Sequence, residues 1–173
     1  MARNKDNVIL EDAQIRFLNF AGREGQYNRE GDRNFCVLLE DSLADQMSRD
    51  GWNIKTLKAR EDEPERPYVQ VSVGFKGRPP RIVMITSKGR TDLSENEVEL
   101  LDWVDIKHVD LIIRPYDWTV GGKGGIKAYL KSLFLTVDED FLELKYSDVP
   151  AAFDWKRDMI DGQIVDEQLA IEG

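Results

Sequence analysis

Few residues in this sequence could support catalysis. His108 is the only histidine, so histidine-based triads and two-histidine metal sites have almost no residues to draw on. Cys36 is the only cysteine, which excludes an internal disulfide. The glycine-rich run 121–125 is not followed by the lysine and hydroxyl residue of a P-loop. Acidic-x-Lys tripeptides at 105–107 and 143–145 resemble part of a metal-dependent nuclease site, but they arise by chance in a chain that is 33% charged. We therefore expect no enzymatic activity, no metal site and no cofactor.

Cations and aromatic rings give a stronger pattern. Residues 76–90 contain five cations and no acid, and residues 114–131 contain four cations, one acid and three aromatic residues. Single-stranded nucleic acid is bound by cations that follow the phosphates and by flat rings on which bases stack. The alternative interpretation is that half of the aromatic rings pack in the core and that the Lys and Arg side chains only form a solvent-exposed surface. The DNA-binding residues predicted from this pattern are Phe75, Lys76, Arg78, Arg81, Lys88, Arg90, Arg114, Tyr116, Trp118, Lys123, Lys127, Tyr129 and Lys131.

The most specific part of this pattern is a Lys-x-Tyr-x-Lys stripe at Lys127, Tyr129 and Lys131. In a strand these three side chains share one face and follow one another at intervals of about 7 Å. That spacing is close to the phosphate spacing of an extended nucleic-acid strand. The competing interpretation is that Tyr129 packs inside a barrel and the lysines only make the surface soluble.

Charge is distributed unevenly along the chain. The net charge is −9, but residues 138–173 hold 11 acidic and three basic side chains, a net charge of −8, which leaves −1 for residues 1–137. The acidic total is therefore no argument against DNA binding by the body of the protein. It predicts a domain at 1–146 followed by an acidic C-terminal segment at 147–173.

Alternation of apolar and polar residues predicts a mainly β fold. The stretch 68–75 alternates most clearly, and with 81–86 it predicts a β-hairpin whose turn is 76–80. A strand that begins at 109 should stop before Pro115, and 121–125 should be a flexible loop. The remaining expected elements are strands at 7–20, 33–40, 52–57 and 126–137, a loop at 21–32, a connector at 59–67, a helix from Asp41 to Gly51, and a helix at 95–103 opened by a Ser94–Glu97 capping box.

This order of elements is typical of a five-stranded OB-type antiparallel barrel with one or two short helices, because a helix precedes the fourth core strand. A split α+β sheet is the remaining alternative. No run approaches the roughly 18 apolar residues that a membrane helix needs, and the first residues lack the apolar stretch of a secretory signal. With a single cysteine, the chain is therefore expected in the cytoplasm.

Three segments resemble the phage-type single-stranded DNA-binding proteins with an OB fold: 34–39 after the glycine-containing loop, 68–73 with the basic stretch behind it, and 124–133 as the closing strand. The resemblance implies a non-catalytic protein that binds and protects single strands during replication or recombination, cooperatively and with little sequence selectivity. It implies no cofactor and leaves self-association of the chain open.

The resemblance also implies a role for the acidic end, since related proteins often recruit replication partners through such a segment. Residues 154–173 contain too many apolar side chains for a purely disordered tail, so part of the segment should be ordered. Two alternatives remain: an acidic DNA mimic that captures a host factor, and a metal-dependent nuclease. The expected partner-binding residues of the segment are Asp148, Pro150, Phe153 and Trp155.

Overall fold

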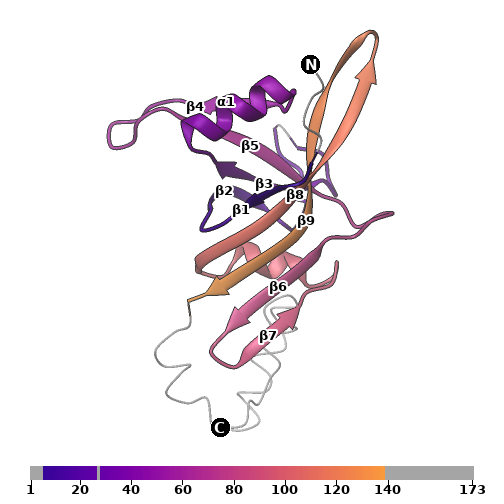
Figure 1. Cartoon of the computed structure of the whole chain (residues 1–173). Helices are drawn as coiled ribbons and strands as arrows, with labels where there is room; N and C mark the ends of the chain where they lie inside the picture. Colours follow the sequence, from indigo (N-terminus) through magenta and orange to yellow (C-terminus); the bar gives the residue numbers. More distant parts are fainter. Residues whose placement is uncertain (1–5, 27, 139–173) are drawn as a thin grey trace, which may run out of the picture.

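A computed structural model describes residues 6–26 and 28–138. These residues form a curled β-sheet with one α-helix and one short 3₁₀ helix (Figure 1). The elements are β1 (Val8–Leu10), β2 (Gln14–Asn19), β3 (Arg33–Leu38), α1 (Asp41–Asp50), β4 (Ile54–Leu57), β5 (Arg66–Val73), β6 (Arg81–Thr86), β7 (Gly89–Asp92), η1 (Val98–Asp102), β8 (Ile106–Val120) and β9 (Lys123–Val137).

The sheet returns on itself in the manner of an OB barrel. Along the path of paired strands the order is β1-β8-β9-β5-β3-β2, and β1 and β2 are consecutive in the chain, so the corner between them joins the two ends of the path. The pairs along this path are antiparallel except β5–β9, which is parallel. The mainly β, OB-type fold expected from the sequence is therefore confirmed, with one parallel pair in the barrel.

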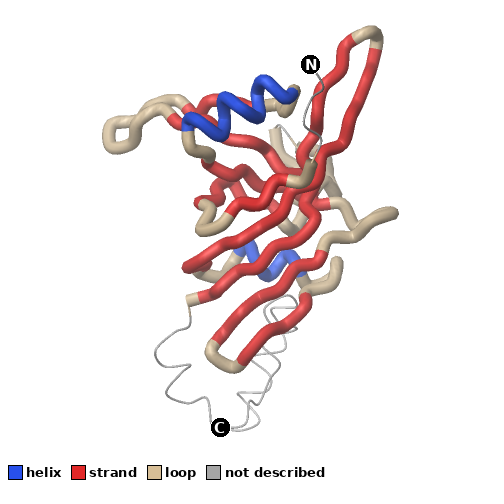
Figure 2. Tube along the Cα trace, in the orientation of Figure 1, coloured by secondary structure: helices blue, strands red, loops and turns tan. Residues whose placement is uncertain are grey.

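Alternating side chains of three neighbouring strands fill the barrel. Phe35 and Val37 of β3, Val71 of β5, and Ala128 and Leu130 of β9 are all buried. Figure 2 shows α1 packed across one end of the sheet, where Ala44 and Met47 are buried. The helix ends at Gly51 in the left-handed conformation (φ 104°), as its sequence predicts.

The first strand bends where the sequence predicts a continuous strand over 7–20. Asp12 has φ 50°, and the strand is divided there into β1 and β2. The bend lets β1 pair with β8 and β2 pair with β3. The Ala13 N–H donates to the Val109 carbonyl oxygen (2.8 Å), which holds the corner against β8.

The sole histidine lies at this corner between two carboxylates. His108 Nδ1 is 3.1 Å from Asp12 Oδ1, and His108 Nε2 is 3.1 Å from both carboxylate oxygens of Asp110. The Asp12 backbone N–H also donates to Asp110 Oδ1 (2.8 Å). This backbone hydrogen bond lowers the pKa of the Asp110 carboxyl below its ordinary value of 3.8; partial burial opposes the shift and His108 adds to it.

Acid is expected to remove the stabilisation that Asp110 provides. Since its pKa is lower in the folded state, this contribution is complete above the unfolded pKa and is lost as the pH falls through the folded pKa. The difference in unfolding free energy between the wild type and Asp110→Asn should therefore shrink between pH 6 and pH 3 in urea titrations. Asp105→Asn controls for the loss of one negative charge at an exposed position. The same pH dependence in both variants would contradict the assignment.

The predicted hairpin over 68–86 is wrong. β5 and β6 do not pair with each other; both run parallel to β9, β5 beside 128–129 and β6 beside 132–136. The chain leaves the sheet after β5, passes through residues 74–80, and rejoins the same side of β9 as β6. β6 then forms an unpredicted hairpin with β7. Alternation reveals a strand but not its partner, so the sequence does not distinguish a tight turn at 76–80 from a connection between two strands that both pair with β9.

The predicted stop at Pro115 and loop at 121–125 are also wrong. β8 and β9 are each 15 residues long and are joined by a two-residue turn at Gly121 (φ 57°) and Gly122 (φ 80°). Proline is tolerated in β8 because β1 pairs no further than Ile113, so the strand has a single neighbour beyond that point. Residues 115–126 project from the barrel as a β-hairpin, which we call the arm (Figure 1).

A β-bulge changes the faces of β9. Ile113 pairs with Leu130 and Ile112 with Ser132, which leaves Lys131 as the extra residue. Simple alternation places Leu133 opposite Leu130, whereas both side chains are buried in the structure. The bulge therefore keeps the second half of the strand in register with the core.

The remaining differences are local. Residues 98–102 form a 3₁₀ helix rather than a helix over 95–103, and its N-cap is Glu97, without a side-chain cap hydrogen bond. One half of the predicted capping box is present, since the Ser94 N–H donates to Glu97 Oε1 (3.2 Å). The Glu97 N–H donates to the Ser94 backbone carbonyl oxygen (3.0 Å). β4 is confirmed within 52–57, and β5 begins inside the predicted connector at Arg66. No helix of the described residues is long and apolar enough to cross a membrane. The predicted boundary at 146 and the acidic segment lie outside the described residues.

Candidate nucleic-acid interface

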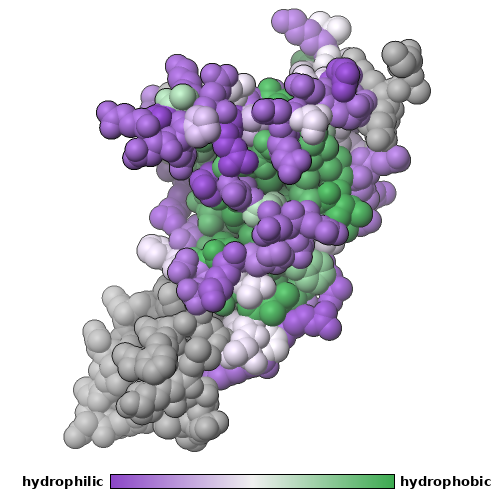
Figure 3. Space-filling model, turned by 60° about the vertical axis from the view of Figure 1, so that its left-hand side comes forward, coloured by the Kyte–Doolittle hydropathy of each residue, from purple (hydrophilic) through white to green (hydrophobic). Residues whose placement is uncertain are grey.

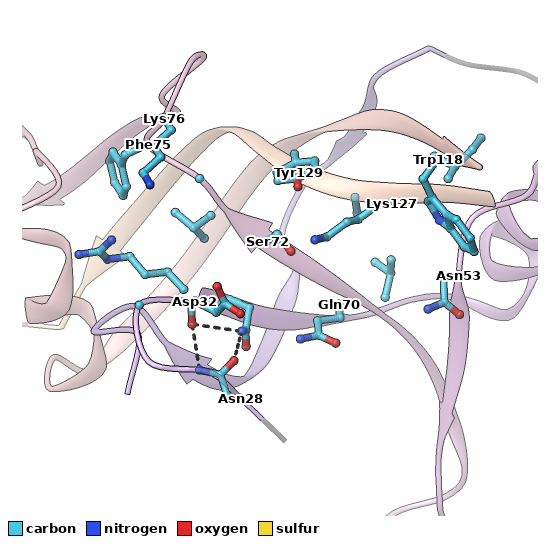
Figure 4. Close-up of a pocket in the computed structure, with 18 of the residues that line it drawn as sticks. Asn28, Asp32, Asn53, Gln70, Ser72, Phe75, Lys76, Trp118, Lys127 and Tyr129 are labelled. Carbon is cyan, nitrogen blue, oxygen red and sulfur yellow. Dashed lines mark hydrogen bonds between the residues drawn. The ribbon is translucent and has the colours of Figure 1, made fainter. Parts of the chain in front are cut away.

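A groove with a volume of about 640 Å³ crosses the outer face of the sheet. Loop 21–32, β5, the residues that follow β5, the arm and the first half of β9 supply its walls (Figure 4). These elements meet because β9 pairs with both β5 and β8. Its lining includes Phe75, Lys76, Trp118, Lys127 and Tyr129, five of the residues predicted from sequence.

Three aromatic rings, those of Phe75, Tyr129 and Trp118, are spaced along one side of the groove (Figure 4). The Tyr129 ring meets the edge of Tyr116 with 5.7 Å between centroids and 83° between planes. Lys127 Nζ lies 5.0 Å from the centre of the Tyr129 ring. Tyr129 is therefore held in place from two sides while its ring lines the groove.

Glycine residues of β9 make room for Trp118. Trp118 pairs with Gly125 across the hairpin, and a β-carbon at Gly125 would lie 3.3 Å from three atoms of the indole. A β-carbon at Gly124 would lie only 2.9 Å from the Trp118 carbonyl oxygen. The glycine run therefore lets the indole lie close over the backbone of the arm, with 38% of Trp118 exposed.

Charges of both signs line the groove. Lys76, Lys127 and Arg33 supply cations, and Asp32 and Glu95 supply carboxylates. Arg33 forms an ion pair with Glu95 (3.3 Å) and lies over the Phe75 ring (5.5 Å). Although residues 76–90 contain no acid, the groove brings carboxylates from other segments beside its cations.

Polar side chains form the wall opposite the rings (Figure 4). Asn34 Nδ2 donates to Asn28 Oδ1 (2.7 Å), and Asn28 Nδ2 donates to the Asp32 carbonyl oxygen (3.0 Å). Gln70 and Ser72 of β5 also line the groove. Asn28, Gln70 and Ser72 are not among the residues predicted from charge and aromaticity, although the alternation in 68–73 points Gln70 and Ser72 away from the core.

A buried carboxylate positions the loop that carries Asn28. The Asp102 side chain, 3% exposed, accepts hydrogen bonds from the backbone N–H groups of Phe20 (2.8 Å) and Ala21 (3.0 Å). It also accepts one from Arg23 Nη2 (3.3 Å). The start of loop 21–32 is thereby fixed to the end of η1, so this wall of the groove depends on a residue outside it.

Four other predicted residues line a separate concave surface of about 610 Å³, which we call the cationic hollow. It lies where residues 74–80 rejoin the sheet and beside the bulge in β9. Its lining consists of Asn7, Arg78, Pro79, Arg81, Arg114, Pro115, Lys131 and Ser132. Lys131 therefore belongs to a different surface from Lys127 and Tyr129, although the sequence predicts one continuous stripe.

The remaining predicted residues line neither surface. Lys88 and Arg90 lie at the β6–β7 hairpin, whose turn is at the opposite end of the molecule from the tip of the arm (Figure 1). Lys123 follows the turn of the arm, and Tyr116 is 56% exposed beside Tyr129. The expected partner-binding residues at 148–155 lie outside the described part of the chain.

Nucleophile and metal chemistry find no support in the described residues. Burial raises the pKa of the Cys36 thiol, against a smaller opposing effect of Lys55, so the thiol is protonated at neutral pH. Within 6–26 and 28–138 no group of three or more potential metal-ligating side chains comes together.

Comparison with solved structures supports the fold. The chain is similar to the single-stranded DNA-binding protein of bacteriophage Enc34 in complex with ssDNA, with 14% identity, a TM-score of 0.52, and coverage of 78% of this chain and 88% of that one. A C-terminal truncation of the Enc34 protein gives 15% identity, a TM-score of 0.51, and coverage of 78% and 87%. At this level of identity the likeness shows a shared fold. No curated protein matches the sequence.

A family model matches nearly the whole sequence. The model described as "Putative phage ssDNA-binding domain" covers residues 1–170. The family and the similar structures are DNA-binding proteins rather than enzymes, in agreement with the non-catalytic expectation. With an OB-type barrel, a groove lined by aromatic rings and a family match over residues 1–170, this chain belongs to the phage single-stranded DNA-binding domain family.

Proposed function

We propose that this protein binds and protects single-stranded DNA, without catalysis and largely independently of sequence, during phage DNA replication or recombination. The observation that carries the proposal is the row of Phe75, Tyr129 and Trp118 in one groove with Lys76 and Lys127. Each ring offers a surface on which any base can stack, and each lysine can contact a phosphate. The Enc34 structure in complex with ssDNA, which shares the fold, supports the same conclusion.

The shape of the groove favours single strands over duplex. Stacking requires unpaired bases whose faces are accessible, and bases inside a duplex already stack on each other. The polar wall of amide and hydroxyl groups can satisfy base edges without one fixed pattern of donors and acceptors. We therefore infer broad acceptance of base sequence with strong preference for unpaired strands.

Fluorescence anisotropy with labelled oligo-dT, oligo-rU and duplex DNA tests the proposal. We expect oligo-dT to bind in the nanomolar-to-micromolar range, duplex to bind more weakly, and affinity to fall as salt is raised. Absence of oligo-dT binding at low salt would falsify the proposal. In that case, capture of a basic host protein would favour an acidic DNA mimic, and cleavage of labelled DNA with magnesium or manganese would favour a nuclease.

Protein contacts form a further part of the proposal. We infer recruitment of replication or recombination proteins through Asp148, Pro150, Phe153 and Trp155, on the basis of the family resemblance, and place the protein in the host cytoplasm. Self-association is also proposed, since Ile9 (66% exposed) and Phe17 (56% exposed) are apolar side chains open to solvent. Figure 3 shows apolar surface in the middle of one face, bordered by hydrophilic side chains. Sedimentation velocity of the full chain at several concentrations measures this association.

A further inference from the structure

The cationic hollow differs from the groove in the chemistry of its lining. Arg78, Arg81, Arg114 and Lys131 contribute four positive charges, while the other lining residues are two prolines, an asparagine and a serine. Among the described residues no carboxylate and no aromatic ring lines this hollow. Such a surface suits an anion and offers no ring on which a base could stack.

The cationic hollow and the groove lie side by side along residues 74–80 and along the paired strands β8 and β9. Phe75 and Lys76 line the groove, and Arg78 and Pro79, two and three residues further along the same loop, line the hollow. On the barrel side, Tyr129 lines the groove and its cross-strand partner Arg114 lines the hollow. A single-stranded DNA that extends beyond the aromatic rings of the groove would therefore meet the four cations of the hollow next.

Most of these cations are available to a ligand. Arg78 and Lys131 are exposed, and Arg114 is half-buried. Arg81 lies 3.8 Å from Asp92, but both side chains are more than half exposed, and such surface pairs contribute little. The bulge at Lys131 places an extra residue on the outer side of β9, next to Ser132.

We propose that the cationic hollow is a second segment of the DNA path, which holds phosphates of nucleotides beyond the groove without stacking their bases. This inference rests on the proposed function, since it concerns the same strand. It divides the binding surface into a stacking segment, which binds short oligonucleotides, and a phosphate segment, which engages only when the strand is long enough. Affinity should therefore rise with length in two stages.

A series of labelled oligo-dT lengths tests the division on the full chain. We would use lengths of about 4 to 12 nucleotides, which fall within the range of single OB domains. The test variant is Arg78→Gln with Arg81→Gln, since both side chains are exposed and lie outside the core. The matched control is Lys88→Gln with Arg90→Gln, which removes the same charge at the β6–β7 hairpin.

We expect the test variant to bind the shortest oligonucleotides like the wild type and to bind the longest ones roughly tenfold more weakly. On the longest oligonucleotide the slope of log affinity against log salt should be shallower by about 1.4, because each phosphate contact on a single strand contributes about 0.7. The control variant should change neither quantity.

Three results would overturn the inference: equal weakening of the test variant at every length, no weakening at any length, or a loss in the control as large as in the test variant. Failure of the proposed function itself looks different. In that case the wild type would bind neither short nor long oligo-dT, and no length series could be measured.

Discussion

Replacing Trp118 with alanine is expected to weaken binding of oligo-dT by about 1–3 kcal/mol, the contribution of one ring on which a base stacks. The indole lines the groove, and its side chain belongs to the arm rather than to the barrel core. Gly125 beneath the ring gives the indole one protein-facing side and leaves the other for a base. The loss should therefore fall on DNA binding and hardly on folding.

Two control variants separate stacking from other effects of the change. Trp118→Phe retains a flat ring and should recover most of the affinity. Trp103→Ala removes an indole that is 65% exposed but lines a different hollow from the groove, so it should bind oligo-dT like the wild type. Anisotropy titrations at one low salt concentration measure all three variants. Equal affinities of Trp118→Ala and the wild type for oligo-dT would show that no DNA base stacks on Trp118.

Replacing Asp102 with alanine is expected to lower the free energy of unfolding by about 2–4 kcal/mol, because two backbone N–H groups lose their acceptor in a site that water reaches poorly. The acceptor carboxylate is 3% exposed, and the bonds from Phe20 and Ala21 fix the entry to loop 21–32. Since that loop carries Asn28 and Asp32 into the groove, DNA affinity should fall as well.

Arg23→Ala is the matched control for this effect. The Arg23 side chain is 59% exposed and forms the ion pair with Asp102. Its removal leaves both backbone hydrogen bonds to Asp102 in place. Exposed ion pairs contribute about 0–1 kcal/mol, so this variant should unfold near the wild-type urea concentration. If the two variants were equally destabilised, the ion pair rather than the backbone hydrogen bonds would hold the loop.

The sequence was informative wherever local chemistry determines structure. Alternation predicted the strands over 68–75 and 126–137, where β5 and β9 lie, and Gly51 ended α1 as predicted. One half of the Ser94–Glu97 capping box formed as well, since both partners lie within one turn of chain. The OB-type order of strands followed from these elements, because few folds place a helix before the fourth strand of such a barrel.

Strand partners could not be read from the sequence in the same way. The hairpin predicted over 68–86 failed because both halves are strands, but each pairs with β9, a choice made by contacts some 50 residues away. The predicted strand end at Pro115 is wrong because the missing N–H matters only where a strand has a second neighbour, and β1 stops short of Pro115.

The candidate site was predictable in composition but not in arrangement. Five of the predicted residues share the groove, four share the hollow, and Lys88 and Arg90 lie away from both. The stretch 76–90 looks continuous in sequence, but the chain crosses from one surface to the other within it. The polar wall was missed because amide and hydroxyl side chains such as Asn28 carry no charge signal.

The path of the chain between β5 and β6 has a consequence for how such proteins can diversify. Residues 74–80 interrupt two strands that follow the same side of β9, so this segment contributes no pairing on which the barrel depends. Its length can change by insertion or deletion without altering the register of any strand. Phe75 and Lys76 of this segment line the groove, and Arg78 and Pro79 line the cationic hollow. On the DNA path proposed above, a change in its length would alter the distance between the stacking segment and the phosphate segment. The number of nucleotides that one molecule covers could then change without a change of fold.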